Sequence, residues 1–179
     1  MQRRDFVKCL TLGVVGYTML SKVAYAKTYL TVDQAQALML KDVELTPFTV
    51  ALTKQQAKAI KQASDTRVRN FNMRTWRSAN NDWFIVDQVI GKHENIDLAV
   101  VINRLGQVTH IEVLTYRETY GDQIMHPKWL AQFYGRDSSE HLKLDKQIRN
   151  ISGATLSCRH VTDGINRLTH TWKQVLSKL

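Results

Sequence analysis

The chain contains little cysteine and little proline. Of its 179 residues, two are cysteine (Cys9 and Cys158) and two are proline (Pro47 and Pro127). So few cysteines exclude a fold built on several disulfides, and no cysteine or histidine group has zinc or haem spacing, so we expect no metal site. Few prolines and only eight glycines exclude a long flexible linker or a low-complexity segment. The length suits one domain with a real hydrophobic core.

The first 26 residues have the features of an export signal. Arg3 to Lys8 reads R-R-D-F-V-K, a twin-arginine pattern, and an uncharged, mildly apolar stretch follows from Cys9 to Leu20. Ala24 to Ala26 supplies a small-x-small cleavage pattern, and the apolar stretch is too short for a membrane anchor. We expect a twin-arginine signal peptide over 1–26 and a periplasmic location. An ordinary secretory signal and an uncleaved anchor are the alternatives.

Basic residues outnumber acidic ones, and the formal net charge is +9. Removing residues 1–26 takes away four of the 25 basic and one of the 16 acidic residues, which leaves +6. An exported protein meets no nucleic acid, so an acidic redox partner or an anionic membrane surface is the better candidate. A solvated basic surface is the simplest alternative, because the charges are spread along the chain.

Removal of residues 1–26 also leaves Cys158 as the one cysteine, so no internal disulfide is expected. Cys158 suits a small semi-buried position.

The pattern of apolar residues predicts an α+β fold, with helices packed on an antiparallel sheet. Thr31 and Thr53 carry capping signals for helices over 31–39 and 54–64. Trp83 to Ile90 is rich in strand-forming residues. Two further runs, Leu98–Ile102 and Val108–Leu114, flank turn residues 103–106 and predict a hairpin.

Helix is also expected after Pro127 and over the C-terminal region. There the apolar residues recur at three- and four-residue spacing, which indicates one buried helix face: Val161, Ile165, Leu168, Trp172, Val175, Leu176 and Leu179. We divide the chain into the signal peptide (1–26), an N-terminal helical part (27–80) and a core domain (81–179).

The segment before the C-terminal helix, Asn150 to Ser157, reads N-I-S-G-A-T-L-S. Ser157 or Thr155 suits the N-cap of that helix. The unpaired N–H groups and the positive dipole end of a helix N-terminus favour a phosphate. Gly153 permits a close backbone approach or a positive φ, and Ala154 keeps the neighbourhood small. The segment therefore predicts an anion site, with a plain helix cap as the alternative.

The letters S-G-A-T resemble the flavinylation motif of the FMN-binding domain family, which includes flavin subunits of the Rnf and sodium-translocating NADH:quinone reductase complexes. In that family the threonine hydroxyl is esterified to the FMN phosphate, and the matching residue is Thr155. The family pattern D-x-x-S/T-G-A-T has an Asp where this chain has Arg149. Tyr116 to Gly121 is similar to the family's E-T-x-G element, and Trp129 to Gly135 resembles its next block. The resemblance covers roughly residues 83 to 175.

The resemblance implies FMN as cofactor, attached through Thr155, although Arg149 leaves the covalent bond open. It places the cofactor-binding residues in the motif and in the E-T element: Ser152, Gly153, Ala154, Thr155, Leu156, Ser157, Glu118 and Thr119. Lys92 and His93 are weaker candidates for a place at the flavin edge, because polar residues are common in loops between strands whether or not a ligand binds there.

The implied role is an electron-transfer module between membrane-associated redox partners. FMN supplies the redox chemistry, and no residue set suggests a catalytic acid, base or nucleophile. The implied partners are an FMN transferase and a membrane-bound donor or acceptor, such as an iron–sulfur or cytochrome protein. Two alternatives stay open: an FMN-dependent reductase of a small exported substrate, and a flavin-free interaction module.

Overall fold

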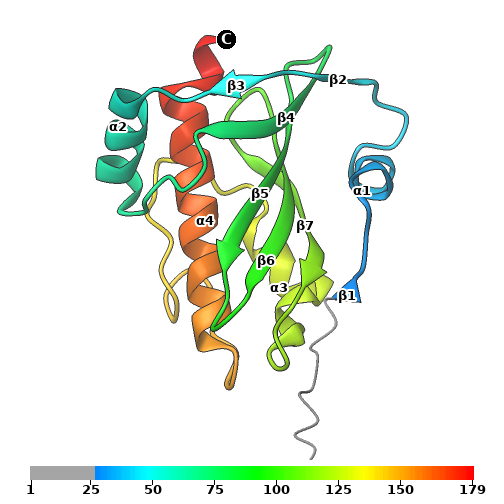
Figure 1. Cartoon of the computed structure of the whole chain (residues 1–179), viewed down its shortest axis with the longest axis vertical. Coiled ribbons are helices and arrows are strands. Elements are labelled where there is room, and N and C mark those ends of the chain that lie inside the picture. The colour runs from blue at the N-terminus through cyan, green and yellow to red at the C-terminus, as the bar shows by residue number, and fades with distance from the viewer. Residues whose placement is uncertain (1–26) are drawn as a thin grey trace, which may run out of the picture.

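The computed structural model describes residues 27–179 and shows a curved antiparallel sheet with helices on both faces (Figure 1). The described strands have the order β1-β7-β6-β5-β4-β2, and β3 pairs with β4. Their bounds are β1 (Lys27–Thr28), β2 (Leu45–Pro47), β3 (Val50–Ala51), β4 (Asn72–Ser78), β5 (Trp83–Ile90), β6 (Asn95–Ile102) and β7 (Val108–Tyr116). The α+β prediction is confirmed. The predicted signal peptide lies outside the described residues.

The helices are α1 (Val32–Met39), α2 (Lys54–Ser64), α3 (Pro127–Leu130) and α4 (Thr155–Gln174), and the short 3₁₀ turns are η1 (Asp122–Met125), η2 (Ala131–Phe133) and η3 (Leu176–Lys178). Within residues 27–179, no helix combines the length and the apolar character needed to cross a membrane. Figure 1 shows α2 and α4 on one side of the sheet and α1 on the other.

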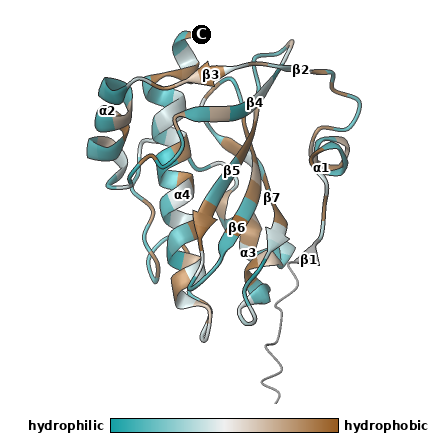
Figure 2. Cartoon of the chain, in the orientation of Figure 1, coloured by the Kyte–Doolittle hydropathy of each residue, from teal (hydrophilic) through white to brown (hydrophobic). Residues whose placement is uncertain are grey.

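Both faces of the central strands are buried. The larger core cluster joins α2 and α4 to side chains such as Ile85 and Leu98, and the smaller one joins α1 to Phe84 and Val101. Because successive strand residues point to opposite faces, β5 and β6 are apolar over consecutive positions rather than alternate ones. Figure 2 shows these hydrophobic colours along β5, β6 and β7, against a largely hydrophilic α2.

The two N-terminal helices begin as the sequence predicts. The side chains of Thr31 and Thr53 accept hydrogen bonds from the backbone N–H of Gln34 and Gln56, and the side-chain oxygen of each glutamine accepts the N–H of its threonine. These reciprocal bonds satisfy donors that a helix start otherwise leaves free. Segment 27–80 also contains β1 to β4, which the sequence analysis did not predict. Its expected boundary near residue 80 falls in the turn between the paired strands β4 and β5.

The hairpin prediction is confirmed. Strands β6 and β7 pair along their length, and the Asn103 N–H donates to the carbonyl of Gln107 over 2.9 Å to close the turn. The C-terminal helix is confirmed as well, with Val161, Ile165 and Leu168 buried. It ends at Gln174, so the buried Val175 and Leu176 lie just beyond it, and Leu179 is exposed.

Candidate functional site at the start of helix α4

The S-G-A-T segment forms the entry to α4. Ala154 is the N-cap, makes no side-chain capping bond, and its N–H donates to the Ile151 carbonyl over 3.0 Å. Thr155 is the first helical residue, so the prediction that Thr155 or Ser157 caps the helix is wrong. The reason lies in Gly153, whose φ of +84° turns the chain early and starts the helix at Thr155.

The helix start presents several unused hydrogen-bonding groups. Among residues 27–179, the backbone N–H groups of Thr155, Leu156 and Ser157 have no acceptor, because α4 has no side-chain cap. The half-buried Thr155 hydroxyl likewise makes no hydrogen bond within the described chain. A side chain added at Gly153 would meet nothing within 4 Å, so the backbone is open on that side. These groups suit a phosphate.

Cationic side chains lie on the same side of the helix start as Thr155. A hollow of about 300 Å³ is lined by Thr155, Arg159 and Lys143, together with His141, Leu142, Leu144, Asp145, Thr162 and Asp163. Thr155 and Arg159 are four residues apart and so share one helix face. Arginine is the side chain best matched to phosphate oxygens. The donor set therefore fits the phosphate of a flavin mononucleotide, with Arg159 and Lys143 as counter-charges.

The E-T-Y-G element packs directly against the motif. A Cβ atom on Gly121 would lie 2.9 Å from the Cβ of Ala154, so the two loops touch. The Tyr116 hydroxyl donates to the carbonyl of Tyr120 over 2.5 Å. Burial raises the pKa of Tyr116, a hydrogen bond with Ser157 opposes that effect, and nearby carboxylates, Glu118 first among them, raise the pKa further. Ser157, itself buried, thus faces Tyr116 from the first turn of α4.

Glu118 holds the loop between β5 and β6. One carboxylate oxygen accepts the N–H of His93 at 2.5 Å and that of Glu94 at 2.9 Å. Partial burial acts to raise the pKa of Glu118, but the N–H groups of Glu94, His93 and Lys92 outweigh it and keep the pKa below its ordinary value. The same loop contacts α4, where the His160 Nδ1 lies 3.0 Å from the carbonyl of Gly91.

The side chains of Lys92 and His93 and those of Thr119 and Tyr120 are exposed. Tyr120 is 82% exposed and precedes Gly121, which contacts the motif. The structure therefore brings the E-T element and the motif together. Glu118 acts within the protein as an anchor for the β5–β6 loop.

The third block, Trp129 to Gly135, meets the residues just before the motif. The Trp129 Nε1 donates to the carbonyl of Arg149, and the Arg149 N–H donates to Gln132 Oε1, each over 2.8 Å. Beside these bonds lies a hollow of about 580 Å³ with a mainly apolar lining. It is lined by Gln123, His126, Lys128, Trp129, Gln132, Arg149, Asn150 and Ile151. Its size is that of a small-molecule site.

The comparisons with known proteins agree with this geometry. The family model described as the FMN-binding domain matches residues 91–170. The matched stretch includes the hairpin, the E-T element, the Trp129 block and the motif at the start of α4. Residues 91–170 thus match the FMN-binding domain family, and the match indicates FMN as the cofactor. A search of curated proteins found no match.

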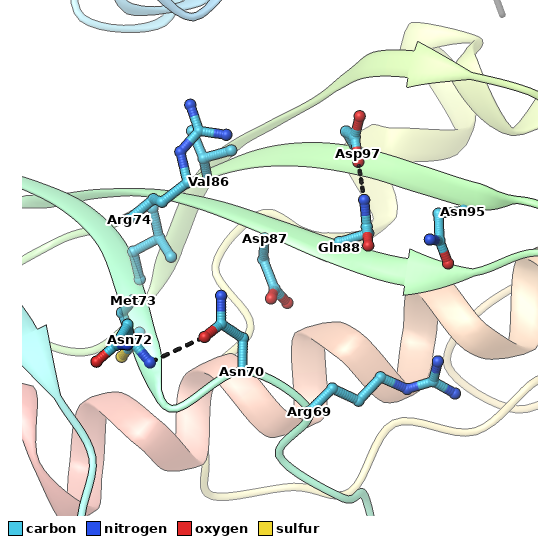
Figure 3. A pocket seen from close by; sticks show the side chains of 11 residues that line it. Arg69, Asn70, Asn72, Met73, Arg74, Val86, Asp87, Gln88, Asn95 and Asp97 are labelled. Carbon is cyan, nitrogen blue, oxygen red and sulfur yellow. Dashed lines mark hydrogen bonds between the residues drawn. The ribbon is translucent and has the colours of Figure 1, made fainter.

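A separate polar hollow of about 330 Å³ lies at the edge of β5, away from the motif (Figure 3). The hollow lies where the pairing between β4 and β5 stops, because the pair Arg74–Val86 ends their register and the rest of β5 is not paired with β4. Its carboxylates have partners of their own: Asp97 binds Arg117, and Asp87 binds Arg167. None of the residues predicted to hold the cofactor lines it. Within residues 27–179, no three His, Cys, Asp or Glu side chains are placed to hold a metal ion.

Sequence reasoning missed Arg159, Lys143 and the contact between Gly121 and Ala154. Arg159 could have been found, because a basic residue four positions after Thr155 must share its helix face. Lys143 could not, since nothing in its own segment indicates that it folds back to the start of α4.

Proposed function

We propose that the protein is an exported electron carrier whose FMN is joined to Thr155 through a phosphoester. The observation that carries the proposal is the position of Thr155. Its half-exposed hydroxyl makes no hydrogen bond within the described chain, and it lies at an uncapped helix start beside Arg159 and Lys143. A nucleophilic hydroxyl, phosphate-binding N–H groups and counter-charges are thus gathered at one place.

The attachment needs an FMN transferase and an FMN phosphoanhydride as donor. A bond forms between Thr155 Oγ1 and the phosphorus, the anhydride bond breaks, the leaving phosphate departs with its electron pair, and the hydroxyl proton is lost. Arg159 and the first N–H groups of α4 would stabilise the phosphate charge during that transfer. Arg149, in place of the family's Asp, does not line the hollow at Thr155 and takes no part in this step.

The attachment is tested by Thr155→Val, which removes the hydroxyl with little change of shape. The wild-type protein from its own host should keep its yellow colour through acid precipitation, and the variant should release all flavin. Thr155→Ser is the matched control, since it retains a hydroxyl. Flavin that stays on the Thr155→Val chain through denaturation would move the bond elsewhere, with Ser152 the next candidate because it is exposed.

Export is proposed from the R-R-D-F-V-K pattern. Changing Arg3 and Arg4 to lysine should leave precursor in the cytoplasm. The control variant, in which Lys22 and Lys27 are changed to arginine, should still be exported. Fractionation of cells that make each variant measures the outcome. Unimpaired export of the Arg3, Arg4 variant would favour the general secretory route.

Electron carriage, rather than substrate turnover, is proposed because FMN exchanges electrons singly or in pairs and the described residues around the motif form no acid–base pair. Donors and acceptors of the iron–sulfur or cytochrome kind fit this role. With a net charge of +6 after removal of residues 1–26, encounter with an anionic partner or an anionic membrane surface should slow as salt rises. Stopped-flow reoxidation of the reduced protein by cytochromes, at several ionic strengths, measures this. Fast, salt-insensitive turnover of a small organic acceptor would instead show a reductase.

A further inference from the structure

We propose that Arg149 raises the reduction potential of the flavin, by holding a positive charge at the wall of the 580 Å³ hollow in which the isoalloxazine ring lies. The inference deepens the proposed function, since it concerns the same cofactor. It requires FMN to be bound but does not require the bond to Thr155.

The hollow is the place where the three segments of the family resemblance meet. Gln123 follows the E-T element, Trp129 begins the next block, and Ile151 leads into the motif. The hollow is connected to Thr155 by a single turn, which the hydrogen bond from the Ala154 N–H to the Ile151 carbonyl closes. The chain thus provides a polar site at Thr155, with Arg159 and Lys143 among its lining residues, for the phosphate and a mainly apolar site within one turn for the ring.

The charge in this hollow is of one sign. Lys128 and Arg149 line it, and no carboxylate does. The backbone of Arg149 is fixed from both sides by Trp129 and Gln132, at 2.8 Å in each case. Its guanidinium forms no ion pair or hydrogen bond with any described residue, so the charge is not neutralised within residues 27–179. An arginine also stays protonated at every relevant pH.

A second group in the same hollow lacks a partner. The side-chain oxygen of Asn150 is buried and accepts no hydrogen bond from the described residues. Buried acceptors are nearly always paired, so this oxygen calls for a donor. The isoalloxazine carries one ring N–H group between two carbonyls, which can donate to an amide oxygen while the carbonyls face cationic side chains. The hollow therefore matches the ring in its size and in its charge.

The consequence follows from the charge change on reduction. Two electrons and one proton convert the neutral oxidised ring to an anion, and the electrons come from the reductant that the measurement supplies. A cation at an apolar wall interacts more strongly with that anion than with the neutral ring. An Asp at this position, as in the family pattern, would act in the opposite direction. The chain should accordingly hold its flavin at a higher potential than the same chain with Asp at position 149.

The test uses the FMN-loaded protein and three substitutions, Arg149→Gln, Arg149→Asp and Arg149→Lys. The two-electron potential is measured by spectroelectrochemical titration. Sulfite affinity is measured in parallel, because the sulfite adduct of a flavin also carries a negative charge on the ring. Arg149→Gln should weaken sulfite binding about tenfold and lower the potential by about 30 mV, the equivalent of tenfold for two electrons. Arg149→Asp should lower the sulfite affinity and the potential further. Arg149→Lys should keep most of the wild-type sulfite affinity and most of the wild-type potential.

Arg104→Gln is the matched control, an exposed arginine in the β6–β7 turn, which packs against Trp172 near the far end of α4. It should change neither quantity. The proposal is overturned if Arg149→Gln carries FMN with wild-type potential and sulfite affinity, or if Arg104→Gln has the same effect. Release of all flavin by acid from the wild-type protein, with the Arg149 effects intact, would contradict only the bond to Thr155.

Discussion

Gly164 of α4 and Val89 of β5 are in direct contact, since a Cβ atom on Gly164 would lie 2.6 Å from Cγ1 of Val89. The helix backbone therefore rests on the side chain of the strand, with no room for even a methyl group. Arg167, nearly one turn further along α4, donates to the carboxylate of Asp87 on the same strand. These two contacts fix how α4 lies against the sheet and hence where its first residue, Thr155, is held.

Gly164→Ala should destabilise the protein by about 1–2 kcal/mol. Overpacking of a close contact costs about 1–3 kcal/mol, and the better helix propensity of alanine returns up to about 1 kcal/mol. Val89→Ala in the same chain should relieve the contact, so the two substitutions together should cost less than their sum. Urea unfolding of the single and double variants measures this coupling. A Gly164→Ala protein more stable than wild type would show that the helix can move away.

Local signals predicted the elements whose caps and periodicity are self-contained. Helix α2 begins after Thr53 because the bonds that cap it come from within its own first turn. Strand β5 could be predicted from its run of apolar residues, and the β6–β7 turn from Asn103 and Gly106. In each case the residues that decide the structure are adjacent in the sequence.

Strand β4 could not be predicted in the same way. Its sequence, N-M-R-T-W-R-S, is polar and lacks a clear alternation, and it becomes a strand through pairing with β5 and with the short strands β2 and β3. The candidate site also has one part that the sequence predicted and one part that it did not. The motif was visible in the sequence, but the anchoring of the β5–β6 loop by Glu118 joins residues 24 and 25 positions apart. Such long-range pairing leaves no local pattern.

Gly121→Ala should weaken FMN binding as well as stability. Gly121 has a φ of +90°, and a Cβ there would meet Ala154 at 2.9 Å, so the substitution pushes the E-T loop away from the motif. Gly135→Ala is the matched control: its φ is +76°, but a Cβ there meets nothing within 4 Å. Both variants should lose about 1 kcal/mol or more through the positive φ. Only Gly121→Ala should also bind FMN less tightly, as measured by flavin fluorescence titration, and equal affinities would show that the junction is not part of the site.

Asp87→Asn should destabilise the protein more than Asp97→Asn does. The side chain of Arg167 is 7% exposed, so loss of the Asp87 charge leaves a buried guanidinium without its counter-ion. Breaking a buried pair costs about 3–5 kcal/mol, and we expect about 2–3 kcal/mol here because Asp87 is 22% exposed. The pair of Asp97 with Arg117 is more exposed, at 21% and 32%, and should be worth at most about 1 kcal/mol. Chemical denaturation at neutral pH compares the two, and equal losses would contradict the role of burial.

Glu118→Gln should make stability less sensitive to acid. The N–H groups of the β5–β6 loop overcome the effect of partial burial and keep the pKa of Glu118 below the ordinary value of 4.5. A carboxyl with a lowered pKa in the folded state contributes stability above its ordinary pKa, and that contribution is lost as pH falls through the lowered value. The wild-type free energy of unfolding should thus fall more steeply below pH 4.5 than that of Glu118→Gln.

Glu112→Gln is a control for that measurement, because it should change the acid dependence of stability in the opposite direction. Burial raises the pKa of Glu112, so this carboxyl favours the folded state as the pH falls, and its removal should make the acid loss steeper. Amide exchange gives a local readout for Glu118→Gln, since the His93 and Glu94 N–H groups that bind the carboxylate should exchange faster even at neutral pH. Unchanged exchange at these two amides, together with an unchanged acid slope, would show that Glu118 does not anchor the loop in solution.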